Sequence, residues 1–379
     1  MKRIYLDYAA ATPVDPKVLT AMMPYFSDIF YNPSALYEGA REAKKALEDA
    51  RSLTAQLLGA RAPEIIFTAG GTESTNLAIH GVMQSYPGSE LIISAVEHDA
   101  VLKPASVYNA KIAKVFNDGR VDIDALKSQI TVNTVLISVM LANNEIGTIQ
   151  PLKEIIKLVE SVKTDRKANK NTMPLYVHTD ACQAPLYLDV HVARLSVDLM
   201  TLNGGKMYGP KQSGILYVKT GTKIKPIITG GGQEWGNRSG TENVAFAVGF
   251  ARALELAGKG RAERLIAMTE LRDYFMTELE TRFGAEITGS RSNRLAQNVH
   301  AVFAGADNER VIFALDDAGI SVASGSACSA SIDTPSHVLM AIDKSEKEAR
   351  SSVRFSFGES TTKEILNKVL KALALALKA

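Results

Sequence analysis

The sequence has few cysteines and no excess of charge of either sign. Its 379 residues include only Cys182 and Cys328, which cannot form a disulfide framework, so a reducing, cytoplasmic setting is expected. Lys and Arg number 43 against 41 Asp and Glu, a net charge of +2, which gives no electrostatic case for binding nucleic acid or a membrane surface. No apolar run approaches the roughly 20 residues that cross a bilayer, and the N-terminus lacks a signal-peptide pattern.

The length exceeds what one hydrophobic core usually serves, so two domains are expected. From about residue 63 to 220, short apolar strands alternate with helical patterns, which is typical of a mostly parallel sheet with helices on both faces. After about residue 243 the alternation is less regular and suggests α+β structure. We therefore predict an α/β protein with a large domain over 16–257 and a smaller α+β domain formed by 1–15 and 258–379.

Helical periodicity gives more local predictions. A helix is expected over residues 38–58, ending at Gly59, a favoured residue after a helix C-terminus. A second helix should begin near Pro151, since proline is tolerated in the first turn. The basic run at 163–170 is expected to form a solvated loop between this helix and the next strand.

Two apolar runs, at 174–177 and 197–202, predict neighbouring buried strands. Asp180 follows the first run, and Lys206 follows the second within a glycine-rich turn. An acid and an amine at neighbouring strand ends suit pyridoxal phosphate, which needs a lysine for covalent attachment and an acidic partner for its ring nitrogen. A buried ion pair of purely structural value is the alternative.

Polar residues also follow the other expected strands of this sheet. Gly70-Gly71-Thr72 lies between a strand and a helix, where free backbone N–H groups suit a phosphate. His98 follows the next strand, where its ring could stack on a planar cofactor and move protons. Asn144 and Gln183 follow later strands. Taken alone, each of these residues is also explained as a helix cap or as a buried residue whose polar atoms are hydrogen-bonded within the core. Because ligands gather at the carboxyl ends of parallel strands, their convergence favours a binding site.

The glycine-rich stretch 230–243 is long and polar, and such loops are usually functional or disordered. Its Arg238-Ser-Gly-Thr241 end carries donors suited to a phosphate. A flexible linker between domains is the alternative.

Two further residues carry candidate chemistry in the C-terminal third. Cys328 lies among small residues after a strand, where a thiol can act as a nucleophile; an inert loop thiol is equally compatible. Arg354 interrupts an apolar strand, and its planar guanidinium suits a substrate carboxylate; a structural ion pair is the alternative. Cys182 is expected to be a small buried filler.

Taken together, these segments resemble the cysteine desulfurases of the NifS/IscS type. The matching motifs occur in the family's order and cover nearly the whole chain: Asp7-Tyr-Ala-Ala-Ala-Thr-Pro, Thr72-Glu-Ser-Thr-Asn, Glu97-His, Asn143-Asn-Glu-Ile-Gly, His178-Thr-Asp-Ala-Cys-Gln, Lys206-Met-Tyr-Gly-Pro-Lys, Gly230-Gly-Gly-Gln-Glu, Arg238-Ser-Gly-Thr and Ser324-Gly-Ser-Ala-Cys. The family is part of the class V aminotransferases, which are fold type I pyridoxal-phosphate enzymes and form homodimers. The resemblance implies that fold, that cofactor and that assembly.

The resemblance also implies roles around the cofactor ring. Lys206 would hold pyridoxal 5'-phosphate covalently and move the Cα proton of the substrate. Asp180 would keep the ring nitrogen protonated, and His98 would stack on the ring. Gln183 would bond the phenolic oxygen, and Asn144 would orient both ring and substrate. Metal ligands are not expected.

Further implied roles concern the phosphate and the substrate. Gly71, Thr72 and Asn203 would bind the phosphate, with Thr241 reaching in from the partner subunit. Arg354 would bind the carboxylate of L-cysteine. Cys328, as a thiolate, would attack the substrate sulfur, which leaves a persulfide on the protein and releases L-alanine. The sulfur would then serve iron–sulfur cluster assembly, thiolated cofactors or tRNA through a scaffold or other acceptor protein.

Two positions depart from the family pattern. Gly205 stands where relatives carry histidine before the lysine, so cofactor binding is expected to be weaker by about 1.5–3 kcal/mol, the value of one charge-assisted hydrogen bond. Tyr37 stands in an early loop where relatives usually carry histidine. This difference is expected to affect details of the substrate entrance. The alternatives to a cysteine desulfurase are a selenocysteine lyase or cysteine-sulfinate desulfinase on the same scaffold, and a catalytically weakened sulfur-relay subunit.

Overall fold

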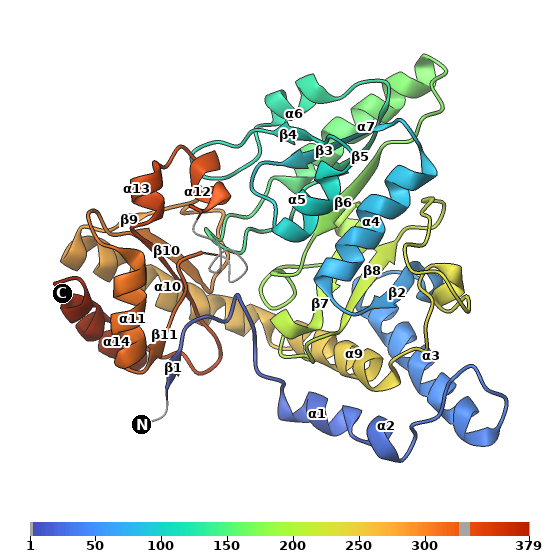
Figure 1. Cartoon of the computed structure of the whole chain (residues 1–379), viewed down its shortest axis with the longest axis horizontal. Helices are drawn as coiled ribbons and strands as arrows, with labels where there is room; N and C mark the ends of the chain where they lie inside the picture. The colour runs from blue at the N-terminus through green and yellow to red at the C-terminus, as the bar shows by residue number, and fades with distance from the viewer. Residues whose placement is uncertain (1–2, 326–333, 379) are drawn as a thin grey trace.

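A seven-stranded sheet forms the centre of the protein in the computed structural model, which describes residues 3–325 and 334–378 (Figure 1). Its strand order is β2-β8-β7-β6-β5-β3-β4. All neighbouring pairs are parallel except those of β8, which runs antiparallel to both neighbours. The strands are β2 (Ile65–Thr68), β3 (Glu90–Ser94), β4 (Lys111–Ala113), β5 (Thr134–Ser138), β6 (Tyr176–Asp180), β7 (Leu199–Asn203) and β8 (Gly214–Val218). The expected α/β class with a mostly parallel sheet is confirmed.

Both faces of this sheet are buried. Consecutive residues of one strand point to opposite sides, and in β2 Ile65 and Ile66 belong to different core clusters. The cluster of Ile66 includes residues of α4 (Gly71–Ser85) and α5 (Asp99–Ser106), which lie side by side in Figure 1. The cluster of Ile65 includes residues of α7 (Leu152–Ala168) and α9 (Val244–Gly258). Helices α1 (Pro16–Met22) and α3 (Glu38–Leu58) pack on α9.

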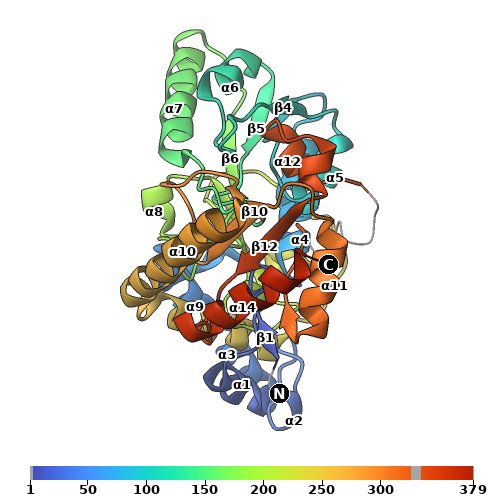
Figure 2. The same ribbon diagram turned by 90° about the vertical axis from the view of Figure 1, so that its left-hand side faces the viewer.

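A second group of elements surrounds a three-stranded antiparallel sheet in the order β12-β10-β9. These strands are β9 (Glu286–Ile287), β10 (Asn298–Val302) and β12 (Ser352–Ser356), and α10 (Arg261–Phe283), α11 (Asn308–Asp317) and α14 (Lys363–Ala376) lie around them (Figure 2). Strand β1 (Ile4–Tyr5) pairs in parallel with β11 (Ile320–Ser321), which brings the N-terminal segment to this group. The proposed domain division at 16–257 stays a prediction. The remaining helices are α2 (Pro24–Ser27), α6 (Ile123–Gln129), α8 (Val192–Leu195), α12 (His337–Ala341) and α13 (Glu346–Ala349).

The helix predictions agree with the structure except at the basic run. Helix α3 ends at Leu58, and Gly59 adopts the left-handed conformation with φ 65°, as expected. The predicted loop at 163–170 is wrong, because α7 continues to Ala168. Lysine and arginine are good helix formers and are favoured near a helix C-terminus. Arg166 is buried and donates to the carbonyls of Met173 and Thr131, in the segments that lead into β6 and β5, which holds the end of the helix against the sheet.

The strands before the candidate site begin and end later than predicted. Strand β6 covers Tyr176–Asp180 rather than 174–177. His178 is fully buried within β6, where its Nδ1 lies 2.8 Å from Ser138 Oγ and its Nε2 lies 3.0 Å from Thr201 Oγ1. Cross-strand partners therefore allow polar residues in the strand interior. No helix among the described residues combines the length and apolar character that a bilayer crossing requires.

Candidate active site

A cavity of about 200 Å³ opens at the carboxyl ends of β5, β6 and β7. It brings together most of the residues singled out in the sequence: Gly71, Thr72, His98, Asn144, Asp180, Gln183, Asn203, Lys206 and Arg354. They come from six separate segments of the chain. The sheet topology accounts for the convergence, since parallel strands end at one edge.

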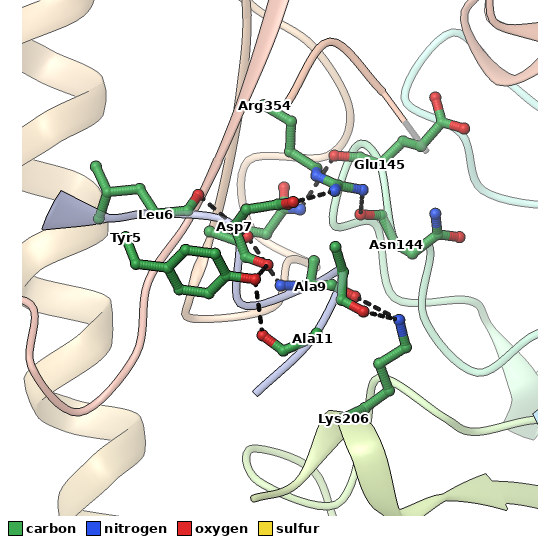
Figure 3. Close-up of polar contacts among 12 residues, drawn as sticks. Tyr5, Leu6, Asp7, Ala9, Ala11, Asn144, Glu145, Lys206 and Arg354 are labelled. Carbon is green, nitrogen blue, oxygen red and sulfur yellow. Dashed lines mark hydrogen bonds and ion pairs between the residues drawn. The ribbon is translucent and has the colours of Figure 1, made fainter. Parts of the chain in front are cut away.

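Lys206 follows β7 in a single 3-10 turn, Gly204–Lys206. Its Nζ donates to the carbonyl oxygens of Ala9 at 3.0 Å and Ala10 at 2.5 Å (Figure 3). Burial lowers the pKa of Lys206, and the positive charge of Arg354 lowers it further, while nearby acidic groups oppose the shift. A lowered pKa increases the neutral fraction of the amine, which is the form that reacts with an aldehyde.

Asp180 ends β6 and faces the same cavity. Its Oδ1 accepts a hydrogen bond from the backbone N–H of Cys182 at 2.9 Å, which fixes the carboxylate. Burial raises the pKa of the Cys182 thiol, with the negative charge of Asp180 adding to the effect, so this thiol stays protonated. Cys182 was expected to be a buried filler; the structure instead places it in the wall of the cavity.

The start of α4 forms a cup beside Asn203. A Cβ atom on Gly71 would lie 2.8 Å from Cys182 Sγ, so a larger residue here would require the thiol to shift. Asn203 Oδ1 accepts from the N–H of Gly205 at 3.0 Å, and the amide nitrogen of Asn203 lies beside Gly71. Thr72 is exposed and lines the same space. Free N–H groups at a helix start, with side-chain donors around them, make a site for an anion such as phosphate.

His98 occupies the N-cap position of α5. Its Nδ1 accepts from the backbone N–H of Ala100 at 3.0 Å, which leaves Nε2 as the nitrogen that carries or exchanges a proton. Glu97, the preceding residue, is fully buried, and burial raises its pKa to about 8. Its Oε1 accepts from Ser94 and from the N–H of Met140, whereas Oε2 has no partner among the described residues.

Arg354 lies in β12 and is 1% exposed. One guanidinium nitrogen is 2.7 Å from Asp7 Oδ1, and another donates to the carbonyl of Asn144 at 3.1 Å (Figure 3). Its Nε has no hydrogen-bond partner within the described residues. Arg354 therefore both forms an ion pair and lines the cavity. Gln183 lines the cavity too, and its amide donates to the carbonyl of Ala9 at 3.0 Å.

The structure does not bring Thr241 to this cavity. Thr241 is exposed and lines a different hollow with Glu234 and Arg238. The loop around it is anchored, because Arg51 bonds both carboxylate oxygens of Glu234 at 2.7 and 2.8 Å and both side chains are 2% exposed. Arg238 Nε lies 2.8 Å from Glu73 in α4. Cys328 lies outside the described residues.

Asp7, Ala9 and Ala10 are not among the site residues expected from the sequence. Ala9 and Ala10 contribute only carbonyl oxygens, and a short apolar stretch carries no chemical signal; their only clue is that they belong to the N-terminal motif of the resemblance. Within residues 3–325 and 334–378, no three His, Cys, Asp or Glu side chains are grouped so that they could hold a metal ion.

Comparisons with known proteins agree on one family. The model of the aminotransferase class-V family matches residues 4–369. A protein named cysteine desulfurase IscS from Dictyoglomus turgidum is 44% identical over 382 residues, covering 98% of this chain and 94% of the relative. Among solved structures, a NifS-like protein superposes with a TM-score of 0.89 at 32% identity and covers 99% of both chains. A structure of SspA in complex with cysteine gives a TM-score of 0.80 at 33% identity, covering 93% of this chain and 98% of the other.

Proposed function

The chain belongs to the class-V aminotransferase family, and we propose that it is a pyridoxal-phosphate-dependent cysteine desulfurase, which converts L-cysteine to L-alanine and transfers the sulfur to Cys328. The observation that carries the proposal is the cavity that joins the Lys206 amine, the Asp180 carboxylate and the cup at Gly71. The names of the relatives support the same activity. They do not favour a selenocysteine lyase, a desulfinase or a sulfur-relay subunit.

The residues present fit pyridoxal phosphate. Gly71, Thr72 and Asn203 would hold the phosphate in a cup that a side chain at position 71 would fill. Asp180 would bond the ring nitrogen and Lys206 would bind the aldehyde, while His98 would contact the ring and Gln183 its phenolic oxygen. When bound, the cofactor supplies an electron sink for the bonds broken at the substrate.

The protein's own groups bind the substrate and move its protons. Arg354 would bind the carboxylate of L-cysteine, since it lines the cavity and its Nε has no hydrogen-bond partner among the described residues. Lys206 would take the proton from Cα and later return a proton to the product, because burial lowers its pKa and so favours the neutral amine that can accept a proton. Asn144 would orient the substrate, and His98 Nε2 would hold a proton close to it.

The sulfur then moves to Cys328. Its thiolate attacks the substrate Sγ, so an S–S bond forms while the substrate C–S bond breaks. The electron pair of the C–S bond stays with the carbon, where a proton completes L-alanine. L-cysteine and a thiol thus give L-alanine and a persulfide, with no external oxidant or reductant needed. Release of that sulfur as sulfide requires a thiol reductant, whereas an acceptor protein takes it onto its own thiol as a persulfide.

The proposed function also implies a homodimeric assembly and an acceptor for the sulfur. Thr241 lies outside the cavity of its own chain, which supports a homodimer in which Thr241 binds the phosphate of the partner subunit. The sulfur acceptor would be an iron–sulfur scaffold or another sulfur-carrier protein in the cytoplasm.

The proposed activity is tested by measuring the ratio of sulfide to L-alanine that the protein releases. The purified protein, given L-cysteine and dithiothreitol, should release sulfide and L-alanine in equal amounts. Cys328→Ala should abolish sulfide release while the visible spectrum of the cofactor is retained, and Lys206→Ala should lose both. Full sulfide release by Cys328→Ala would contradict the proposed role of that thiol.

A further inference from the structure

A buried network of hydrogen bonds crosses the central sheet beneath the cavity. His178 lies at its centre in β6, with its Nδ1 2.8 Å from Ser138 Oγ in β5 and its Nε2 3.0 Å from Thr201 Oγ1 in β7. Thr75 in α4 extends the network, because its hydroxyl donates to Thr201 Oγ1 at 3.3 Å. All four side chains are fully buried. This His178 network therefore joins three neighbouring strands and one helix through side chains alone.

The His178 network lies directly beneath residues that line the cavity. Side chains two positions apart on a strand point to the same face of the sheet and are about 7 Å apart along the strand. Asp180 stands two positions beyond His178 in β6, and Asn203 stands two positions beyond Thr201 in β7. Both Asp180 and Asn203 line the cavity. A shift in the spacing of the network would therefore be passed directly to these two residues.

The same network reaches the helix that begins at the cup. Helix α4 covers the face of the sheet that carries the network and contacts β5, β6 and β7 (Figure 1). Thr75 is three residues beyond Thr72, about one turn further along α4. Its bond to Thr201 ties this part of α4 to the strand that leads into Lys206. The cup, the Asp180 strand end and the lysine turn thus share one set of hydrogen bonds.

The network adds no positive charge beside Asp180. Burial lowers the pKa of His178 to about 4, although the negative charge of Asp180 opposes the shift, so the imidazole is neutral near pH 7. A neutral imidazole donates from one nitrogen and accepts at the other, which suits two hydroxyl partners. His178 therefore does not compete with a ring nitrogen for the Asp180 carboxylate.

We propose that His178 and Thr201 are positioning residues for pyridoxal phosphate, which fix the separation between the cup at Gly71 and the Asp180 carboxylate. This inference rests on the proposed function. Replacing both partners of a buried hydrogen bond by apolar groups can be nearly neutral for stability, whereas a satisfied polar network specifies one arrangement. A cofactor held at both its phosphate and its ring nitrogen needs these two contacts at one distance. Inorganic phosphate needs only the cup.

Two probes of the full-length, cofactor-free protein separate this distance from the cup itself. Visible absorbance follows the binding of pyridoxal phosphate, and inorganic phosphate is added as a competitor. Thr201→Val keeps the shape of the side chain and removes its hydroxyl. It should weaken pyridoxal-phosphate binding by roughly 3- to 10-fold, as expected for one or two uncharged hydrogen bonds. The inhibition constant of phosphate should stay within about twofold. Thr201→Ser, which keeps the hydroxyl, should restore the affinity, and His178→Leu should behave like Thr201→Val.

Thr179→Val is the matched control. Thr179 follows His178 in β6 and is also fully buried, but it points to the opposite face of the sheet. Its Oγ1 has no hydrogen-bond partner among the residues that the structure describes. The control therefore removes the same hydroxyl from the same sheet without breaking a bond of the network, and its affinity for pyridoxal phosphate should equal that of the wild type.

Three results would overturn the inference. A folded Thr201→Val could bind pyridoxal phosphate as tightly as the wild type, the control could lose as much affinity, or phosphate and pyridoxal phosphate could weaken together. If Thr201→Val does not fold, Ser138→Ala removes the bond at β5 and is judged by the same results. A wild-type protein that binds no pyridoxal phosphate on Lys206 would instead overturn the proposed function.

Discussion

Restoring the family's histidine before the lysine should tighten cofactor binding. Gly205 is buried beside the cup at the start of α4, and the atoms nearest to a Cβ built on it lie 3.5 Å away, on Asn203 and Lys211. That distance is ordinary van der Waals contact, and the backbone of Gly205 is not in the left-handed region. A Cβ atom is therefore tolerated there. Gly205→His would place an imidazole next to the residues that we assign to the phosphate.

The size of the effect follows from the chemistry of that contact. A hydrogen bond to a charged group contributes about 1.5–3 kcal/mol. At about 1.4 kcal/mol per tenfold, the dissociation constant of pyridoxal phosphate should fall by roughly 10- to 150-fold. The gain should be greatest where the added imidazole is protonated, below about pH 6.5.

Titration of the cofactor-free protein with pyridoxal phosphate, followed by its visible absorbance, measures this change. Gly205→Ala is the control, because it adds a Cβ without a donor and should leave the affinity near that of the parent. If Gly205→His folds with the parental stability and binds the cofactor no more tightly than Gly205→Ala, the phosphate does not lie at this turn.

Three further predictions test other parts of the account. Glu234→Ala should lower the free energy of unfolding by about 3–5 kcal/mol, because the buried Arg51 would lose its buried carboxylate partner and keep only the half-exposed Glu48; urea denaturation measures this, and a loss under about 1 kcal/mol would contradict it. Arg354→Ala should weaken L-cysteine binding by roughly 10- to 100-fold and leave the cofactor spectrum unchanged, whereas equal affinity in both proteins would refute carboxylate binding. Glu97 keeps its proton in the folded state between its ordinary pKa of 4.5 and about 8, so the folded state binds more protons there and stability falls as pH rises through that window. Glu97→Gln should remove this dependence and be more stable than the wild type at pH 9 by about 3–5 kcal/mol; melting curves that change equally with pH in both proteins would count against it.

From the sequence, the sheet and the strand ends that carry the site residues could be predicted more accurately than the first and last residues of individual helices and strands. Asp180, Lys206 and His98 follow apolar strands, and the rule that ligands gather at carboxyl ends of parallel strands was enough to group them. The bounds of β6 were missed because His178 is polar, and its partners on neighbouring strands are invisible to hydropathy. The extension of α7 was missed because charge alone does not distinguish a solvated loop from an exposed helix end.

Contacts between distant segments could not be predicted. Asp7 reaches Arg354 because β1 pairs with β11 and Asp7 itself bridges Ser356 in β12, pairings between segments far apart in sequence. The same placement brings the carbonyls of Ala9 and Ala10 to Lys206. Every residue type has a main-chain carbonyl oxygen, so the residue types at positions 9 and 10 give no sign of these contacts.

The central claim is that Lys206 carries pyridoxal phosphate covalently, opposite Asp180. Reduction of the purified protein with borohydride, followed by proteolysis and mass spectrometry, tests this most directly. The account predicts a single pyridoxyl adduct on the peptide that contains Lys206, with loss of the visible absorbance. An adduct on a different lysine, or a coloured protein whose Lys206 peptide stays unmodified, would contradict it.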